Sequence, residues 1–292
     1  MNDANRRWVY LIVLSLIWGS SFILMKKALV GLTPIQVGTL RISFTAITLF
    51  IVGFKSLSQI KKEHYKPILI TAALGTFIPV FLFAYAIKGI DSSITSILNS
   101  LTPLNTLIIG ALIFGFKFNK FQKAGVFIGF LGTLILIISS ANINSNQNYI
   151  FAILPIIASI GYAFNVNILK RDLKNLSALS ITTANFAVMI IPALIILYFT
   201  GFFNTYTIEN KALNLSLLYL AILSVFGTAL AKTMFNKLVQ ISSPVFSSSV
   251  TYLIPITAVA LGVLDGEKFM LSQIFASVIV FAGVYLSSKK ST

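Results

Sequence analysis

The sequence predicts an all-α integral membrane protein, and three observations lead to this prediction. Apolar residues make up 57% of the 292 residues and charged residues only 10%, whereas soluble domains usually contain about 25% charged residues. The mean hydropathy is +0.92. The apolar residues also occur in repeated runs of roughly 20 residues, which is the length of an α-helix that spans a bilayer. We therefore expect most of the chain to lie in a membrane.

Apolar runs of spanning length predict ten transmembrane helices. Their approximate ranges are 8–28, 34–54, 67–88, 93–115, 121–140, 149–169, 177–200, 214–237, 243–264 and 270–287. The first run follows Arg6-Arg7 in the manner of a signal peptide, but it is too long for one and no small-residue cleavage site follows it. The longest connections, near 139–148 and 201–213, are too short to fold independently. We therefore expect no soluble domain.

The distribution of Lys and Arg predicts the orientation of these helices. Fifteen of the 22 cationic residues fall on one side of the ten-helix scheme and five fall on the other side. Because cytoplasmic loops carry an excess of Lys and Arg, we expect both termini on the cytoplasmic side of a cell membrane, either inner or plasma. The net charge of +15 then reflects topology, and we expect no nucleic-acid partner. Cysteine is absent, which excludes disulfides.

The two halves of the sequence resemble each other. Gly75-Thr76 in the first half corresponds to Gly227-Thr228 in the second, and Pro103 corresponds to Pro255. We assign the first repeat to residues 1–141 and the second to residues 142–292. Because five helices per half is an odd number, the second half enters the membrane from the opposite side. Inverted repeats place a substrate site at their interface, near the middle of the membrane.

Polar residues within the spans predict where a cavity lies, because they are costly in contact with lipid. Two spans carry such residues at i, i+4 and i+8, which places them on one helix face. They are Thr95, Asn99 and Pro103 in the first half and Ser247, Thr251 and Pro255 in the second. These faces either line a cavity or hold helices together through hydrogen bonds between them.

Aromatic, hydroxyl and amide residues deep in other spans are further candidates for substrate contact. They are Trp18, Ser21, Tyr85, Tyr162, Asn165 and Tyr252. Trp18 lies roughly ten residues into its span, which is too deep for the aromatic belt at a membrane surface. Tyr162 and Asn165 are three residues apart and can therefore share a helix face.

Two cationic residues, Arg41 and Lys232, lie inside predicted spans. Arg41 is either a structural anchor, which extends its stem to the interface or binds backbone carbonyls, or a functional group. Lys232, with Asn236 four residues later, either attracts an anionic or carboxylate-bearing substrate or extends to the cytoplasmic headgroups. The sequence leaves both alternatives open.

The acidic residues and the single histidine lie outside the middle of the predicted spans. All seven Asp and Glu fall at or beyond helix ends, and His64 lies in a connection. No carboxylate or imidazole is therefore placed for a proton relay at mid-membrane, and no catalytic or metal-binding constellation can be assembled. Passive facilitation or exchange is therefore favoured, and Na⁺ coupling through helix ends and freed carbonyls stays an open alternative. Without a nucleotide-binding loop, direct ATP drive is unsupported. We expect no enzyme, no cofactor and no metal site built from side chains.

Several short motifs resemble those of the EamA-like transporters of the drug/metabolite transporter superfamily. They are Ile17-Trp18-Gly19-Ser20-Ser21-Phe22, Arg41, Leu101-Thr102-Pro103, Thr251-Tyr252-Leu253-Ile254-Pro255, and Gly262 with Gly266-Glu267. The resemblance implies ten helices, an inverted duplication and a central cavity among helices 1, 3, 4, 6, 8 and 9. One departure is that the first half has Phe116 where the second half has Glu267.

The function expected from these features is transport of small organic metabolites by alternating access around the central cavity. The resemblance implies export, facilitated movement or exchange of amino acids, nucleobases or related molecules. The alternative is a translocator of lipid-linked or amphipathic substrates, which would require a cavity that opens sideways to lipid. The expected partners are the small-molecule substrate and the lipid bilayer, and the expected assembly is a monomer or homodimer.

Overall fold

A computed structural model describes residues 3–90, 92–138, 148–203, 211–264 and 271–289, and these residues form helices and short connections. The α-helices are α1 Asp3–Ala28, α2 Pro34–Gly53, α3 Tyr65–Ala72, α4 Ile78–Gly89, α5 Ser92–Asn99, α6 Thr102–Leu112, α7 Lys120–Ile138, α8 Ile153–Asp172, α9 Ala178–Phe199, α11 Lys211–Ser224, α12 Ala231–Ile241, α13 Pro244–Ser248, α14 Val250–Leu264 and α15 Leu271–Ser287. The 3-10 turns are η1 Phe54–Gln59, η2 Lys62–His64 and η4 Tyr149–Ala152, and the π-helical turns are η3 Ala73–Phe77 and η5 Val225–Leu230. The all-helical class expected from the sequence is thus observed in the described residues.

Each range predicted from the sequence contains one helix or two consecutive helices. Six helical runs among the described residues are long and apolar enough to cross a membrane. They are Asn5–Ala28, Pro34–Gln59, Lys62–Gly89, Ile150–Asp172, Ala178–Phe199 and Leu213–Ile241. Large apolar side chains also point outward, for example Ile51 and Phe199, each 80% exposed. An outer surface of this kind is compatible with lipid and not with water, so the chain is a multi-pass membrane protein.

Two of the predicted helices are interrupted where the sequence had suggested continuous ones. In the first half α5 ends at Asn99 and α6 begins at Thr102, with Pro103 in its first turn. A proline cannot donate a backbone hydrogen bond, and its ring clashes with the carbonyl four residues before it. Thr102 Oγ1 instead donates to Asn99 O at 2.6 Å, so the carbonyl at the break keeps a partner.

The corresponding break in the second half separates α13 from α14 at Ser249. Ser249 Oγ donates to Phe246 O at 2.6 Å, which again satisfies a carbonyl near the break. The two breaks lie next to each other, because Ser100 Oγ donates to Thr251 O at 3.1 Å. Both irregular segments therefore lie inside the protein, where polar backbone groups can be tolerated at membrane depth.

Local capping fixes where several helices start. Thr33 precedes α2, and its Oγ1 accepts from Gln36 N at 3.3 Å while Gln36 Oε1 accepts from Thr33 N at 3.0 Å. This reciprocal pair is a capping box. Ser177 caps α9 in the same repeat position, with its Oγ accepting from Ser180 N at 3.0 Å.

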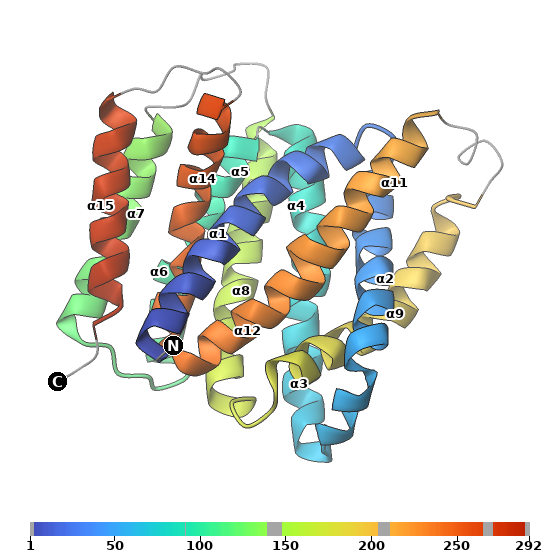
Figure 1. The fold of residues 1–292 in the computed structure, drawn as a ribbon, viewed down its shortest axis with the longest axis horizontal. Helices are drawn as coiled ribbons and strands as arrows, with labels where there is room; N and C mark the ends of the chain where they lie inside the picture. The colour runs from blue at the N-terminus through green and yellow to red at the C-terminus, as the bar shows by residue number, and fades with distance from the viewer. Residues whose placement is uncertain (1–2, 91, 139–147, 204–210, 265–270, 290–292) are drawn as a thin grey trace.

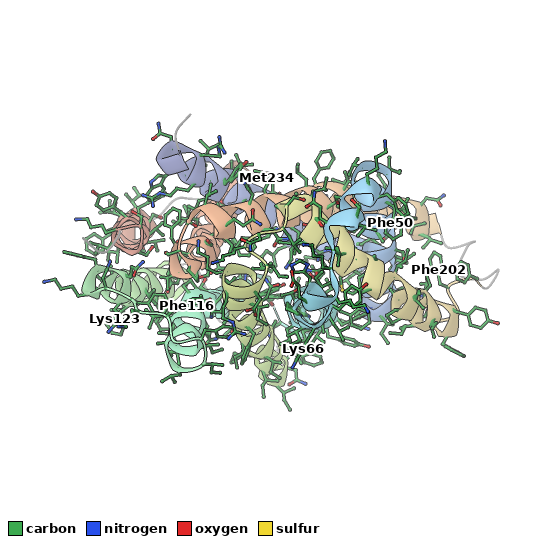
Figure 2. The ribbon with its side chains drawn as sticks, turned by 90° about the horizontal axis from the view of Figure 1, so that it is seen from below. Phe50, Lys66, Phe116, Lys123, Phe202 and Met234 are labelled. Carbon is green, nitrogen blue, oxygen red and sulfur yellow. The ribbon has the colours of Figure 1, made fainter. Side chains whose placement is uncertain are left out.

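The helices are arranged with α7 and α15 side by side at one margin of the molecule and α2, α9 and α11 towards the other (Figure 1). The start of α1 and the end of α15 lie at the same end (Figure 1), where Arg7 Nη1 donates to Ser288 O at 3.4 Å. Viewed from that end, Lys123 and Phe202 lie at opposite margins (Figure 2). The middle of the molecule, between the two margins, contains the cavity described next.

Candidate functional site

A central cavity of about 120 Å³ lies between the two halves of the chain. Both halves contribute to its wall, whereas no described side chain of α7, α9 or α15 lines it. The lining residues are Trp18, Ser21, Phe22, Met25, Arg41, Gly75, Thr76, Val80, Phe83, Asn99 and Thr102 from the first half, and Tyr162, Gly227, Thr228, Lys232, Phe235, Ser248, Val250, Thr251 and Ile254 from the second.

The two π-helical turns occupy matching places in the wall. η3 contributes Gly75 and Thr76, and η5 contributes Gly227 and Thr228, which are the pairs that correspond between the two halves of the sequence. Single π turns inside α-helices are frequent at functional sites, because the wider turn alters which backbone groups are available. The duplicated glycine-threonine pair thus marks the two irregular turns that face the cavity.

Side chains from the opposite half bind the carbonyl groups of both π turns. Trp18 Nε1 in α1 donates to Gly227 O at 3.1 Å. Lys232 Nζ in α12 donates to Gly75 O at 2.5 Å. Each half therefore supplies one donor to the irregular turn of the other half. These two hydrogen bonds join the halves across the cavity.

The glycines at these turns are required by close approach of neighbouring side chains. A methyl group added at Gly75 would lie 2.2 Å from Asn165 Oδ1, and one added at Gly227 would lie 2.8 Å from Ser21 Oγ. Any larger residue would therefore require either these side chains or the π turn to shift. The glycines let α8 and α1 lie close against η3 and η5.

Arg41 links the first half to the second at the side of the cavity. Its Nε in α2 donates to Thr228 Oγ1 at 2.8 Å, and Thr228 Oγ1 donates in turn to Leu223 O at 3.1 Å. Arg41 is thus anchored by a hydrogen bond to η5, and it also lines the cavity. Both alternatives that the sequence left open for this residue are compatible with this position.

Aromatic rings form much of the remaining wall. The rings of Phe83 and Tyr162 are stacked, with centroids 6.0 Å apart and planes 17° apart. Phe22 meets Phe83 edge-on at 6.2 Å, and Trp18 meets Phe235 at 5.2 Å. Lys232 Nζ lies 5.8 Å from the centre of the Tyr162 ring. The cavity therefore combines broad apolar surfaces with a few directed polar groups, as small-molecule sites usually do.

Hydroxyl and amide groups near the helix breaks complete the wall. Asn99 lies at the end of α5, and its Oδ1 accepts from Thr102 Oγ1 at 3.3 Å. At the neighbouring break in the second half, Thr251 Oγ1 donates to Ser248 O at 3.0 Å. These neutral groups can donate to or accept from a bound molecule. Among the residues that the structure describes, none that lines the cavity is Asp, Glu or His.

The structure brings together part of the set of site residues predicted from the sequence. Those that line the cavity are Trp18, Ser21, Asn99, Tyr162, Lys232 and Thr251. Those that do not line it are Tyr85, Thr95, Pro103, Asn165, Asn236, Ser247, Tyr252 and Pro255.

Several residues outside the cavity make packing contacts instead. Tyr252 OH donates to Val126 O at 2.8 Å, and its ring lies against Gly129 in α7. Asn236 Nδ2 donates to Thr182 Oγ1 of α9 at 2.9 Å. Asn236 therefore does not line the cavity, whereas Lys232, four residues earlier, does. Ser247 Oγ bonds with Ser242 Oγ at 2.7 Å. These contacts match the alternative in which polar residues hold helices together.

Asn165 is a special case among the predicted residues. Its side chain is 1% exposed, and both amide atoms are buried without a hydrogen-bond partner. It packs against Gly75 in η3 and does not line the cavity, whereas Tyr162 three residues earlier does. Thr76 Oγ1 in the same turn is also buried and unpaired. Unpaired polar atoms therefore gather around η3.

The lining residues that sequence reasoning missed are mostly apolar or small. Phe83, Val80 and Ile254 carry no feature that distinguishes them from other apolar residues of a span. Gly75-Thr76 and Gly227-Thr228 did carry a signal, because this pair is repeated between the halves. In the described part of the chain, no group of three or more His, Cys, Asp or Glu residues is placed to hold a metal ion.

Comparison with known proteins gives one family for both halves of the chain. The model of the EamA-like transporter family matches residues 6–138 and again residues 149–289. Similar proteins include the inner membrane transporter YedA of Escherichia coli K12, which is 26% identical over 96% of this chain and 92% of that protein.

Two other relatives have names that state a cargo. The S-adenosylmethionine/S-adenosylhomocysteine transporter of Chlamydia muridarum is 24% identical over 95% of this chain and 90% of that protein. A probable amino-acid metabolite efflux pump of Salmonella typhimurium is 25% identical over 93% of this chain and 91% of that protein. One solved crystal structure has 13% sequence identity to this chain and a TM-score of 0.73. The match covers 96% of this chain and 95% of that one, and it shows a likeness in fold.

Proposed function

Since this chain belongs to the EamA-like transporter family, we propose that it moves a small organic metabolite across the membrane through the central cavity. The observation that most directly supports this proposal is the cavity itself, which is lined by both halves and contains the two π turns. Substrate sites of transporters typically lie near mid-membrane at the interface of two repeats, next to irregular helical segments. Relatives named as transporters of amino-acid metabolites or of S-adenosylmethionine are compatible with this class of substrate.

We propose that the chain crosses the membrane ten times, as two inverted repeats covering residues 1–141 and 142–292, with both termini in the cytoplasm. The start of α1 and the end of α15 lie at the same end of the molecule (Figure 1), which supports an even number of crossings. The excess of Lys and Arg in the segments assigned to that side supports the cytoplasmic orientation.

The proposed mechanism is alternating access, in which the two halves rock around a bound substrate. The hydrogen bonds from Trp18 to Gly227 O and from Lys232 to Gly75 O join the halves. These hydrogen bonds stabilise one arrangement of the two halves. They must break, and other contacts must replace them, when the halves change their arrangement. No described residue of the lining is Asp, Glu or His, which supports facilitated movement or exchange over a carboxylate-based proton relay.

Reconstituted protein tests this function directly. Purified protein in liposomes should take up labelled small metabolites faster than empty liposomes do. Asn99→Leu should lower this uptake about tenfold, because the loss of one polar contact to a substrate is worth about 1.4 kcal/mol.

Asn105→Leu is a matched control for this substitution. Asn105 lies in the neighbouring helix α6 and donates to Ser159 Oγ at 2.8 Å outside the cavity. The Asn105→Leu variant should take up the metabolite at a rate within a factor of about two of the wild-type rate. Equal uptake by the wild type and Asn99→Leu would remove Asn99 from the site, and no uptake of any metabolite by the wild type would contradict the function.

A further inference from the structure

We propose that the cavity selects organic anions with a planar apolar body, and that Arg41 and Lys232 bind the carboxylate or phosphate group. This inference rests on the proposed transport function and narrows its substrate class. Two cationic side chains line the cavity, and no acidic side chain lines it among the described residues. Within this part of the chain, no carboxylate of the cavity wall balances the two positive charges.

The burial of Lys232 makes this imbalance costly. Its side chain is 7% exposed, and within the described residues its contacts are the Gly75 carbonyl and the face of the Tyr162 ring. Arg41, in the same wall, has Thr228 Oγ1 as its hydrogen-bond partner among the described residues. A charge removed from water is destabilising unless it is both paired and hydrogen-bonded. A bound anion would supply the missing partner for both groups.

The two cations also keep unused donors for such an anion. Lys232 has three ammonium hydrogens and uses one on Gly75 O. Arg41 uses its Nε hydrogen on Thr228, which leaves both terminal nitrogens of the guanidinium. The terminal nitrogens form a fork that matches the two oxygens of a carboxylate or phosphate group.

The aromatic residues of the wall suit a planar body attached to that anionic group. The stacked rings of Phe83 and Tyr162 adjoin Lys232, whose Nζ lies 5.8 Å from the Tyr162 ring centre. Trp18 and Phe235 form a second aromatic pair in the same wall. Flat apolar molecules gain both burial and ring contacts between such surfaces.

The same wall discriminates against amino groups. An ammonium group needs an acceptor, and a buried one needs a negative charge. No described residue of the wall supplies such a charge, and Arg41 would repel a cation from the side of the cavity. Zwitterions should therefore bind more weakly than anions with the same body, and cations should bind most weakly.

Three molecules that share a phenyl ring and differ in charge test this inference. Phenylpyruvate is an anion, phenylalanine is a zwitterion and phenethylamine is a cation at neutral pH. Uptake into proteoliposomes and displacement of bound phenylpyruvate from the purified protein should both rank them in that order. We expect about a tenfold separation between the anion and the zwitterion. This ranking uses the wild-type protein and does not depend on the folding of any variant.

Substitutions then assign the preference to the two cations. Lys232→Met and Arg41→Gln should each lower phenylpyruvate uptake about tenfold and reduce the preference over phenylalanine, whereas Lys232→Arg should keep the preference. Lys237→Met is the matched control, because it removes the same charge from the same helix at a residue that does not line the cavity. Gel filtration and thermal unfolding identify variants that fail to fold.

The outcomes separate this inference from the function on which it rests. Transport of phenylalanine or phenethylamine in preference to phenylpyruvate would overturn the anion preference and leave metabolite transport in place. Phenylpyruvate uptake unchanged in both folded variants, Lys232→Met and Arg41→Gln, would overturn the assignment to these residues. Absence of uptake for the three molecules and for a wider metabolite set would overturn both proposals.

Discussion

At the scale of single residues, Trp18 and Lys232 perform equivalent tasks with different chemistry. Each donates a hydrogen bond to a π-turn carbonyl of the opposite half. A neutral hydrogen bond of this kind contributes about 1 kcal/mol, and one from a charged group contributes about 1.5–3 kcal/mol. Lys232 additionally brings a charge to the cavity, whereas Trp18 brings an aromatic surface. The two halves are therefore similar in geometry and different in electrostatics.

Trp18→Phe tests the neutral member of this pair. The substitution removes the indole N–H and keeps an aromatic ring next to Phe235. Loss of about 1 kcal/mol at the junction of the halves should lower transport about fivefold. Trp8→Phe is the matched control, since Trp8 lies in the same helix and packs edge-on against Phe246, outside the cavity. Uptake in liposomes measures both variants, and an equal effect of both would contradict a specific role for Trp18.

The part of the site that could be predicted consists of polar and aromatic residues deep within spans. Trp18, Asn99 and Lys232 stood out because such residues are costly next to lipid. Asn165 stood out for the same reason, yet it packs against Gly75 in η3 and does not line the cavity. A helix periodicity gives the face on which a residue lies, but whether that face meets a cavity or another helix depends on packing that one sequence does not contain.

At the scale of helices, close approach through glycine determines the packing at two different kinds of contact. At η3 the neighbour of Gly75 is the side chain of Asn165, which can move. Between α7 and α15 the neighbour is backbone, because a methyl group at Gly283 would lie 2.3 Å from Gly129 N. Small residues let transmembrane helices approach in this way and gain van der Waals contact. The first contact adjoins the cavity and the second lies at the margin (Figure 1).

Alanine substitutions at the two glycines should differ in whether a second change can rescue them. Gly75→Ala should lower the midpoint of thermal unfolding and the transport rate, and Asn165→Ala should restore part of both, because it removes the two atoms that lie closest to the added methyl group. Gly283→Ala should destabilise the detergent-solubilised protein by about 1–3 kcal/mol. No side-chain change can relieve its clash with backbone.

Thermal unfolding monitored by circular dichroism measures all of these variants. A Gly75→Ala protein as stable and active as the wild type would contradict the close contact with Asn165. Failure of Asn165→Ala to improve the double variant would show that another neighbour limits the space at η3.

The positions of the helices themselves could be predicted from the sequence, because runs of apolar residues report directly on contact with lipid. The interruptions at 100–101 and 249 could not be predicted as breaks, although Pro103 lies close to the first. A helix break in a membrane requires partners for the freed backbone groups. The partner of Thr251 O is Ser100 in the other half, and a contact between residues so distant in the chain leaves no periodic signal.

At the scale of the whole molecule, the two halves enclose one cavity whose wall is neither acidic nor metal-binding within the described residues. Outward apolar side chains lie on the helices of both margins, α7 with α15 and α2 with α9, and on the outer faces of α1, α8 and α11. Polar groups and irregular turns are concentrated between them. This division is the one expected when the outer surface meets lipid and the interior meets a solute.

The proposed orientation can be tested with single cysteines, because the chain contains none of its own. Val30 is 75% exposed between α1 and α2, and Ser58 is exposed between α2 and α3. A membrane-impermeant maleimide should label Val30→Cys in intact cells, and it should label Ser58→Cys only after the membrane is opened. The reverse pattern would place both termini outside the cell, and labelling of both residues from one side would contradict a crossing by α2.

The π turns also determine how the chain tolerates changes of length. A π turn holds one residue more than an α-helical turn would hold over the same rise. Removal of one residue within η3 would convert it to an α-helical turn and leave the side chains beyond it, such as Val80 and Phe83, facing the cavity. Removal of one residue within α4 would instead rotate every later side chain of that helix by about 100°. Single-residue insertions and deletions among related transporters should therefore be tolerated at η3 and η5 more often than elsewhere in these two long helices.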